Sequence, residues 1–150
     1  MTERAEAISA WSDSAVLESP DGRFEARMQN AFEIAMGGPT MGTLELSNGL
    51  RWHGCNPSMV WSDDSRYLAL PMWDGKRRQH LMVISLELGE ARFARGELSV
   101  CELDTFEDGI ISGVERPGRL NSMRITFDTA KLDWSPAGRS GKPLNSLPDA

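Results

Sequence analysis

The sequence has little of what most metal sites, exported proteins and membrane proteins need. Its 150 residues include only two cysteines and two histidines, and no pair of them has the two-to-four-residue spacing typical of a zinc site. No apolar run approaches the ~20 residues that span a bilayer. The first residues, MTERAEAISAW, lack the basic and then apolar order of a signal peptide. We therefore expect a cytoplasmic protein that has no membrane association, holds no metal and keeps both thiols reduced.

The chain also lacks an evident catalytic or cofactor motif. The segment GGPTMG, residues 37–42, has no following lysine and no helix that could hold a phosphate, so it predicts a flexible turn. Asp63 and Asp64 are adjacent and stand among turn residues, which indicates hydrogen bonding to turn amides rather than paired acid-base chemistry. The sequence thus predicts no catalytic residues and no cofactor. One alternative is an enzyme with a scattered site near His53, Cys55 and His80; with Cys101, these residues are also the only set for a Cys2His2 metal site.

Excess negative charge argues against nucleic acid as a partner. Lys and Arg number 16 against 22 Asp and Glu, which gives a formal net charge of −6. This charge opposes the attraction to phosphate on which nonspecific nucleic-acid binding depends. Two interpretations remain: the charge keeps the protein in solution, or it forms an acidic surface for a basic protein partner.

Short alternating runs separated by turn residues dominate the sequence. Ser19-Pro20-Asp21-Gly22 precedes the alternating FEARM, and Asn48-Gly49 between apolar alternations is a strong hairpin signal. Later strand candidates include residues 98–103, 110–115 and 120–128. The spacing predicts an all-β fold of about ten short, mostly antiparallel strands in a meander, a sandwich or a partly open barrel.

One run has apolar residues at most positions and predicts the centre of the sheet. Residues 80–86, HLMVISL, would place apolar side chains on both faces of a strand. The 40% of apolar residues is enough for a sizeable core, and the length is that of one domain. We expect a single β domain over residues 1–134, followed by a surface tail over residues 135–150 that is rich in Pro, Gly and Ser.

The segment from Asn56 to Glu90 resembles a known structural unit. VWSDDSRYLAL, a polar turn and HLMVISLELGE resemble one blade hairpin of the WD40-like propellers in TolB-type proteins. ESPDGRFEARM and LDWSPAGRSGK resemble its turn more weakly, and the three turns begin at Ser19, Ser62 and Ser135. Only the first interval suits a blade of about 40 to 45 residues. The chain is too short for the four or more blades of a closed propeller, so the resemblance implies local hairpin geometry.

An acidic stretch supplies the candidate binding residues. From Glu97 to Glu115 the chain has no Lys or Arg. We expect its central part to form a loop in which carboxylates converge beside an aromatic anchor; the alternative is a solvated face without a partner. The candidate partner-binding residues are Glu102, Asp104, Phe106, Glu107 and Asp108.

These observations favour a non-catalytic, cytosolic protein-binding module with a basic partner. Its general character is similar to that of small acidic bacterial immunity proteins, which neutralise cationic toxins by complementary charge. A structural or accessory β domain, assembling through hairpin edges into a larger complex, is the second hypothesis. The sequence leaves the oligomeric state open.

Overall fold

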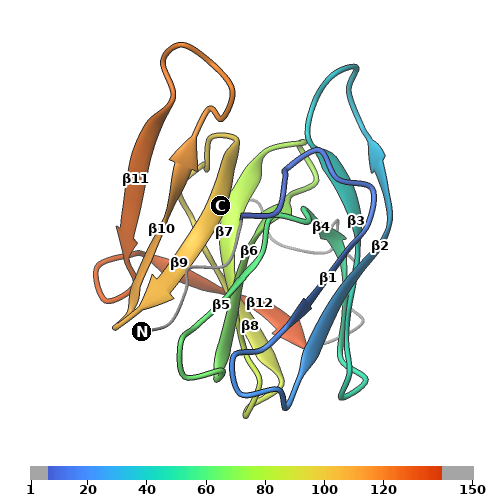
Figure 1. Cartoon of the computed structure of the whole chain (residues 1–150), viewed down its shortest axis with the longest axis vertical. Coiled ribbons are helices and arrows are strands. Elements are labelled where there is room, and N and C mark those ends of the chain that lie inside the picture. The colour runs from blue at the N-terminus through green and yellow to red at the C-terminus, as the bar shows by residue number, and fades with distance from the viewer. Residues whose placement is uncertain (1–6, 140–150) are drawn as a thin grey trace.

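The computed structural model describes residues 7–139, which form twelve β-strands and no helix (Figure 1). The prediction of an all-β fold is therefore confirmed, with two more strands than expected. No segment in this range forms an apolar helix that could span a membrane. The strands are β1 (Ala15–Glu18), β2 (Glu25–Glu33), β3 (Thr40–Leu46), β4 (Arg51–Cys55), β5 (Val60–Trp61), β6 (Tyr67–Trp73), β7 (Gln79–Ser85), β8 (Glu90–Ala94), β9 (Cys101–Glu107), β10 (Ile110–Glu115), β11 (Met123–Asp128) and β12 (Trp134–Arg139).

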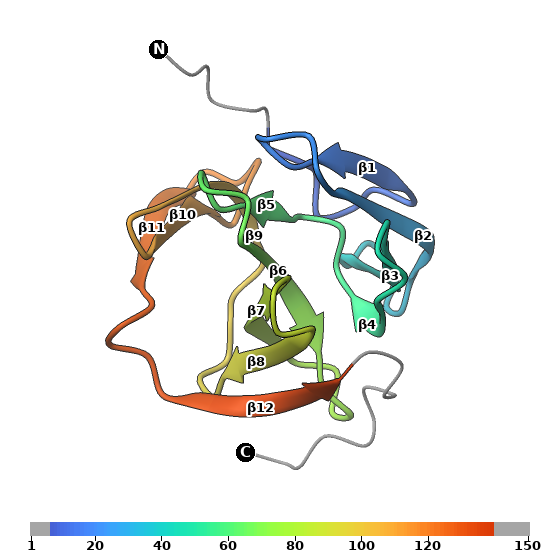
Figure 2. The same ribbon diagram turned by 90° about the horizontal axis from the view of Figure 1, so that it is seen from below.

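The strands form one large and one small antiparallel sheet. The large sheet has the order β1-β2-β3-β4-β6-β7-β8-β12, with β5 paired to β6, and the small sheet has the order β11-β10-β9. Figure 2 shows β2–β4 on one side of the molecule, the small sheet on the other, and β6 and β7 between them. The large sheet ends at β1 and at β12, so it is an open meander and not a closed barrel.

Local turn residues create the first hairpins. The chain reverses between β1 and β2 at Ser19–Gly22, and between β3 and β4 at Asn48-Gly49, as the sequence predicts. Gly49 has a φ of 93°, a conformation that side chains disfavour and glycine adopts readily.

Strand β7 is buried on both faces and lies between β6 and β8. It runs over 79–85, one residue before the predicted central strand at each end, and six of its seven residues are buried. Met82 and Ile84 belong to one core cluster, together with side chains of β2–β4, whereas Leu81 and Val83 belong to a second cluster with side chains of β9 and β10. The hairpin β6–β7 is therefore the common wall of two cores.

The C-terminal part differs from the tail that composition predicts. Residues 135–139 are most of strand β12, which pairs with β8. Pro136 fits because an edge strand has one side on which no N–H donor is required, and the register shifts beside it. The buried Ser135 and Ala137 anchor the strand. The rest of the predicted tail lies outside the described residues.

Two predicted strands begin later than their apolar runs suggest. Strand β9 begins at Cys101 rather than at 98, because Leu98 makes an isolated bridge to Gln79 instead. Strand β11 begins at Met123 rather than at 120, because the chain is still turning at 117–121.

The two-sided burial of β7 gives a stability prediction. Ile84 is fully buried, so we expect Ile84→Ala to lower the free energy of unfolding by about 2 to 5 kcal/mol through lost apolar transfer and the cavity left behind. Val16→Ala is the control, since Val16 is 56% exposed on a sheet edge and should change little. Urea denaturation of both variants measures the difference. Equal, small losses would show that β7 is not the centre of the core.

Candidate functional site

A rigid polar turn precedes β6. The Ser62 hydroxyl donates to Asp64 Oδ1 at 2.7 Å, and the same oxygen accepts the Arg66 amide at 3.1 Å. The Tyr67 amide donates to Ser62 Oγ at 3.0 Å. Hydrogen bonds from the Ser62 hydroxyl and the Arg66 amide hold the pKa of Asp64 below its usual value. The turn is thus fixed by its own side chains, while Ser65 at a φ of 64° reverses the chain.

The same hydrogen bonds recur in the turn before β2. Ser19 Oγ donates to Asp21 Oδ1 at 3.0 Å and accepts the Phe24 amide at 3.0 Å. The two turns also touch, because the Asp21 amide donates to Ser65 Oγ at 3.0 Å. The weak internal similarity of these two segments therefore reflects one shared turn structure. The third similar segment is not such a turn, since Ser135 lies in strand β12.

Asp63 takes no part in that turn through its side chain. Its amide donates to the Phe106 carbonyl at 3.0 Å, which joins the β5–β6 turn to the end of β9. Its carboxylate is exposed and has no hydrogen bond or ion pair within residues 7–139. The expectation that both aspartates bond turn amides is therefore wrong for Asp63 and right for Asp64.

The acidic stretch lies mainly in a strand and not in the predicted loop. Strand β9 carries a bulge, because Ser112 pairs with Thr105 and Gly113 pairs with Leu103, which leaves Asp104 out of the register. Gly113 permits this close approach, since a Cβ there would lie 2.3 Å from the carbonyl oxygen of Glu102. The bulge changes which residues of β9 face inward, so the candidates differ sharply in environment.

Two of the predicted binding residues already have partners. Asp104 accepts two hydrogen bonds from the Arg124 guanidinium, at 3.1 and 2.6 Å. Glu102 Oε2 accepts the Ala10 amide at 3.1 Å. Their carboxylates therefore support the fold, and Asp104 in particular is neutralised by a cation that the linear sequence places 20 residues away.

Phe106 belongs to the core, while its two neighbours stay exposed. Phe106 is only 6% exposed and stacks on Tyr67 with ring centroids 6.3 Å apart, so it is not the surface anchor that the sequence predicts. Glu107 and Asp108 are exposed and have no side-chain partner in the described part of the chain. Asp108, at a φ of 52°, and Gly109, at 77°, make the tight turn into β10.

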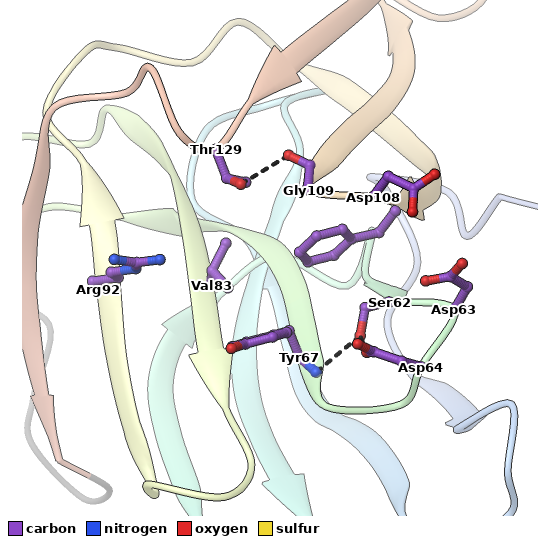
Figure 3. Close-up of a pocket in the computed structure, with 10 residues that line it drawn as sticks. Ser62, Asp63, Asp64, Tyr67, Val83, Arg92, Asp108, Gly109 and Thr129 are labelled. Carbon is purple, nitrogen blue, oxygen red and sulfur yellow. Dashed lines mark hydrogen bonds between the residues drawn. The ribbon is translucent and has the colours of Figure 1, made fainter.

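These turns border a cavity of about 230 Å³ between the two sheets, which we call the inter-sheet pocket (Figure 3). It brings together the β5–β6 turn, strands β6–β8, the β9–β10 turn and the residue after β11. The Thr129 hydroxyl donates to the Gly109 carbonyl at 2.8 Å and fixes one wall. The lining residues are Ser62, Asp63, Asp64, Tyr67, Val83, Arg92, Phe106, Asp108, Gly109 and Thr129.

The pocket has opposite charges at its two ends. Figure 3 shows Asp63 and Asp108 on one side and Arg92 on the other, beyond Val83. The Arg92 guanidinium carbon lies 4.8 Å from the centroid of the Trp134 ring, a cation–π contact. Arg92 has no carboxylate partner within residues 7–139. Both charged ends are therefore available to a ligand.

The sequence predicts Asp108 as a binding residue but does not predict Asp63 or Arg92, the other two charged residues at the ends of this pocket. The sequence context of Asp63 indicates a turn residue, and no motif in the sequence around Arg92 indicates a binding role. The only available signals were the paired aspartates of the SDDS turn and the base-free acidic run. Nothing in the spacing of 63, 92 and 108 indicates that they meet, because two sheets must pack before they do.

The structure does not assemble the alternative catalytic site. His53 is exposed, with Nδ1 3.1 Å from the Thr43 hydroxyl. Cys55 is fully buried, and this burial raises the pKa of its thiol to about 12, so the nucleophilic thiolate is strongly disfavoured. Cys55 Sγ contacts the carbonyls of Trp52 and His53, with no histidine nitrogen as a partner.

His80 has a structural environment. Its Nε2 lies 2.8 Å from Asp74 Oδ2, and its Nδ1 lies 3.1 Å from the carbonyl oxygens of both Ala94 and Gly96. Both ring nitrogens are therefore engaged beneath the surface.

The two cysteines are free and belong to different cores. Cys55 lies in the cluster with β2–β4 and Cys101 in the cluster with β9 and β10. Across residues 7–139, no three His, Cys, Asp or Glu side chains converge as a metal site would require.

Comparisons with known proteins find no relative: no family model, no curated protein and no solved structure matches this chain.

The environment of Asp74 predicts a pH dependence of stability. Burial raises its pKa, but hydrogen bonds from His80 and from the amides of Arg78 and Lys76 outweigh burial and hold the pKa at about 2, below the ordinary 3.8. A lowered folded-state pKa stabilises the fold above the unfolded value and loses that effect as pH falls. We expect Asp74→Asn to flatten the fall in unfolding free energy between about pH 4 and pH 2. Urea denaturation at several pH values across this range measures the unfolding free energy. If the variant loses unfolding free energy with falling pH as steeply as the wild type, the lowered pKa does not belong to Asp74.

The two adjacent aspartates provide a matched test of the turn. Asp64→Ala removes both turn hydrogen bonds and should cost roughly 0.5 to 1.5 kcal/mol of unfolding free energy. Asp63→Ala removes no side-chain bond and should leave stability unchanged. Chemical denaturation measures the unfolding free energy of both variants. Equal losses of unfolding free energy would mean that the Asp63 side chain also stabilises the turn.

Proposed function

We propose that this chain is a non-catalytic protein-binding module that binds a basic protein partner at the acidic end of the inter-sheet pocket. One observation supports it most: Asp63 and Asp108, which line the pocket, and Glu107, which precedes Asp108 in the chain, are exposed carboxylates without a cationic partner in the described range. The hydrogen bond from the Asp63 amide to the Phe106 carbonyl holds the two turns together. Like charges gathered this way repel one another in the free protein, so a cation that neutralises them is favoured.

The pocket beside these carboxylates suits a lysine or arginine side chain. Such a side chain has an apolar stem and a charged head, and it can place the two in different environments. The rings of Tyr67 and Phe106 and the side chain of Val83 offer an apolar wall, while Asp63 and Asp108 lie at the mouth. The β5–β6 turn is fixed by its own hydrogen bonds, and Thr129 fixes the β9–β10 turn through Gly109, so little ordering entropy is lost on binding.

Arg92 determines the orientation in which a cationic side chain can enter the pocket. A cation entering from its end meets a guanidinium, whereas one entering from the other end meets two carboxylates. Repulsion by Arg92 disfavours the reversed orientation. Attraction to Arg92 favours a partner that has an acidic group next to its basic side chain, placed to reach the Arg92 end of the pocket.

A small acidic module of this kind fits the role of a bacterial immunity protein in the cytoplasm. There the partner is a cationic toxin, complementary charge speeds the encounter, and the bound module blocks the toxin. The proposal includes no reaction step and requires no cofactor.

The test compares two triple variants with the same change in net charge. In the first, Asp63→Asn, Glu107→Gln and Asp108→Asn neutralise the acidic end; asparagine is chosen at 108 because it tolerates a positive φ. In the second, Glu18→Gln, Glu33→Gln and Glu97→Gln neutralise exposed carboxylates that do not line the pocket. The partner is first isolated by affinity capture on the wild-type protein.

We expect the first variant to associate with that partner at least about tenfold more slowly at low salt, with the difference shrinking as salt is added. The second variant should bind nearly as the wild type does. If both variants lose affinity equally, or if binding is independent of salt, the acidic end is not the binding surface. Protection of cells that express a captured toxin would support the immunity role, and lack of protection would exclude it.

A further inference from the structure

Within residues 7–139, four strands lie at the ends of the two sheets, and each has one side on which no described strand pairs. They are β1 and β12 in the large sheet and β9 and β11 in the small one. Free N–H and C=O groups on an edge strand can pair with another chain, and natural proteins protect most edges against this.

Three of the four edges are protected. Strand β1 has only four residues, and β12 contains Pro136 and a register shift. Strand β9 has the bulge at Asp104 and lies against the β5 region, with hydrogen bonds from the Asp63 amide to Phe106 and from the Leu103 amide to Ser58. Short length, proline, bulges and coverage are the devices that prevent edge pairing.

Strand β11 has none of these four devices, and its two charged residues, Arg124 and Asp128, are of opposite sign. Its six residues, MRITFD, include no proline or glycine, and its register with β10 runs from Ile110↔Asp128 to Glu115↔Met123 without a shift. Figure 1 shows β11 at the outer side of the small sheet, with no described strand beyond it.

The hydrogen bonds to β10 identify which groups of β11 point outward. The Thr129 amide donates to the Gly109 carbonyl at 2.9 Å, so Gly109 and Thr129 are a hydrogen-bonded pair. In an antiparallel ladder such pairs alternate, and every second residue turns its N–H and C=O to the other side. The outward residues are therefore Arg124, Thr126 and Asp128. The Asp128 carbonyl already accepts the Lys131 amide at 2.9 Å, and its second lone pair is the one left for a partner strand.

We propose that β11 pairs with β11 of a second copy of this chain, antiparallel and centred on Thr126. This register is self-complementary, because it places Thr126 opposite the partner's Thr126, and Arg124 opposite the partner's Asp128 on both sides of the two-fold axis. All three outward residues then lie in hydrogen-bonded pairs, and opposite charges face each other across the strands.

Arg124 and Asp128 can pair with the second copy while they keep their hydrogen bonds within their own chain. Arg124 holds Asp104 with Nη1 and Nη2, and its guanidinium has further N–H donors. Asp128 accepts the Ala130 amide with Oδ1 alone, so Oδ2 is left for the partner. The two small sheets become one continuous six-stranded sheet, since each contributes three strands. The contact is small, so a weak dimer is expected.

Charge-reversed single variants test the register. Arg124→Asp places an acid opposite the partner's Asp128, and Asp128→Arg places a base opposite the partner's Arg124, so each variant alone should be monomeric. A mixture of the two variants restores both opposite-charge pairs and should form a heterodimer. Sedimentation velocity over roughly 1 to 500 µM chain measures all species, a range that covers weak interfaces.

The expected result is concentration-dependent dimerisation of the wild type, loss in each single variant and recovery in the mixture. Thr126→Pro removes the outward N–H at the centre without breaking a bond to β10 and should also give a monomer. Circular dichroism confirms that the variants are folded. A wild type that stays monomeric throughout the range, or single variants that dimerise as well as the wild type, would overturn the proposal. The variants lie outside the carboxylates of the inter-sheet pocket, so this result is independent of the proposed function.

Discussion

Burial of the β6–β7 hairpin on both faces is the constraint on which the rest of the structure depends. The two strands pair over seven positions, from Tyr67↔Ser85 to Trp73↔Gln79, and separate two core clusters. A strand covered on both sides cannot alternate apolar with polar residues, which explains why both strands are mostly apolar. Because one cluster reaches β2–β4 and the other reaches β9 and β10, a weakened hairpin would loosen both sheets together.

The hairpin also explains where the inter-sheet pocket forms. Tyr67 begins β6 and is separated by one residue from the SDDS turn, while Val83 lies on β7 and Arg92 on β8. Packing of the small sheet against this face brings the β9–β10 turn next to Asp63. The packed core therefore holds Asp63 and Asp108 in a fixed geometry, which is the arrangement that the proposed binding of a basic partner requires.

Local features of this fold could be predicted from the sequence, and nonlocal ones could not. The Asn48-Gly49 turn, the SDDS turn and the apolar run of β7 each depend on neighbouring residues, and each lies within a residue or two of its predicted position. The bulge in β9 depends on Gly113 of the next strand, and the neutralisation of Asp104 depends on Arg124 beyond it. Pro136 looked like a tail residue because only the pairing with β8 reveals an edge strand. The candidate site was the least predictable feature, because its turns come together only when the two sheets pack.

Native-state hydrogen exchange tests the central role of the hairpin most directly. If β6 and β7 are the shared wall of both cores, the amides of Leu68, Leu70, Val83 and Ile84 should exchange only through global unfolding. Their exchange free energies should then equal the free energy of unfolding from urea denaturation. Amides in β2, β3, β10 and β11 should exchange at equal or lower free energies. Exchange of the hairpin amides through a smaller opening, while β2–β3 stays protected, would contradict this account.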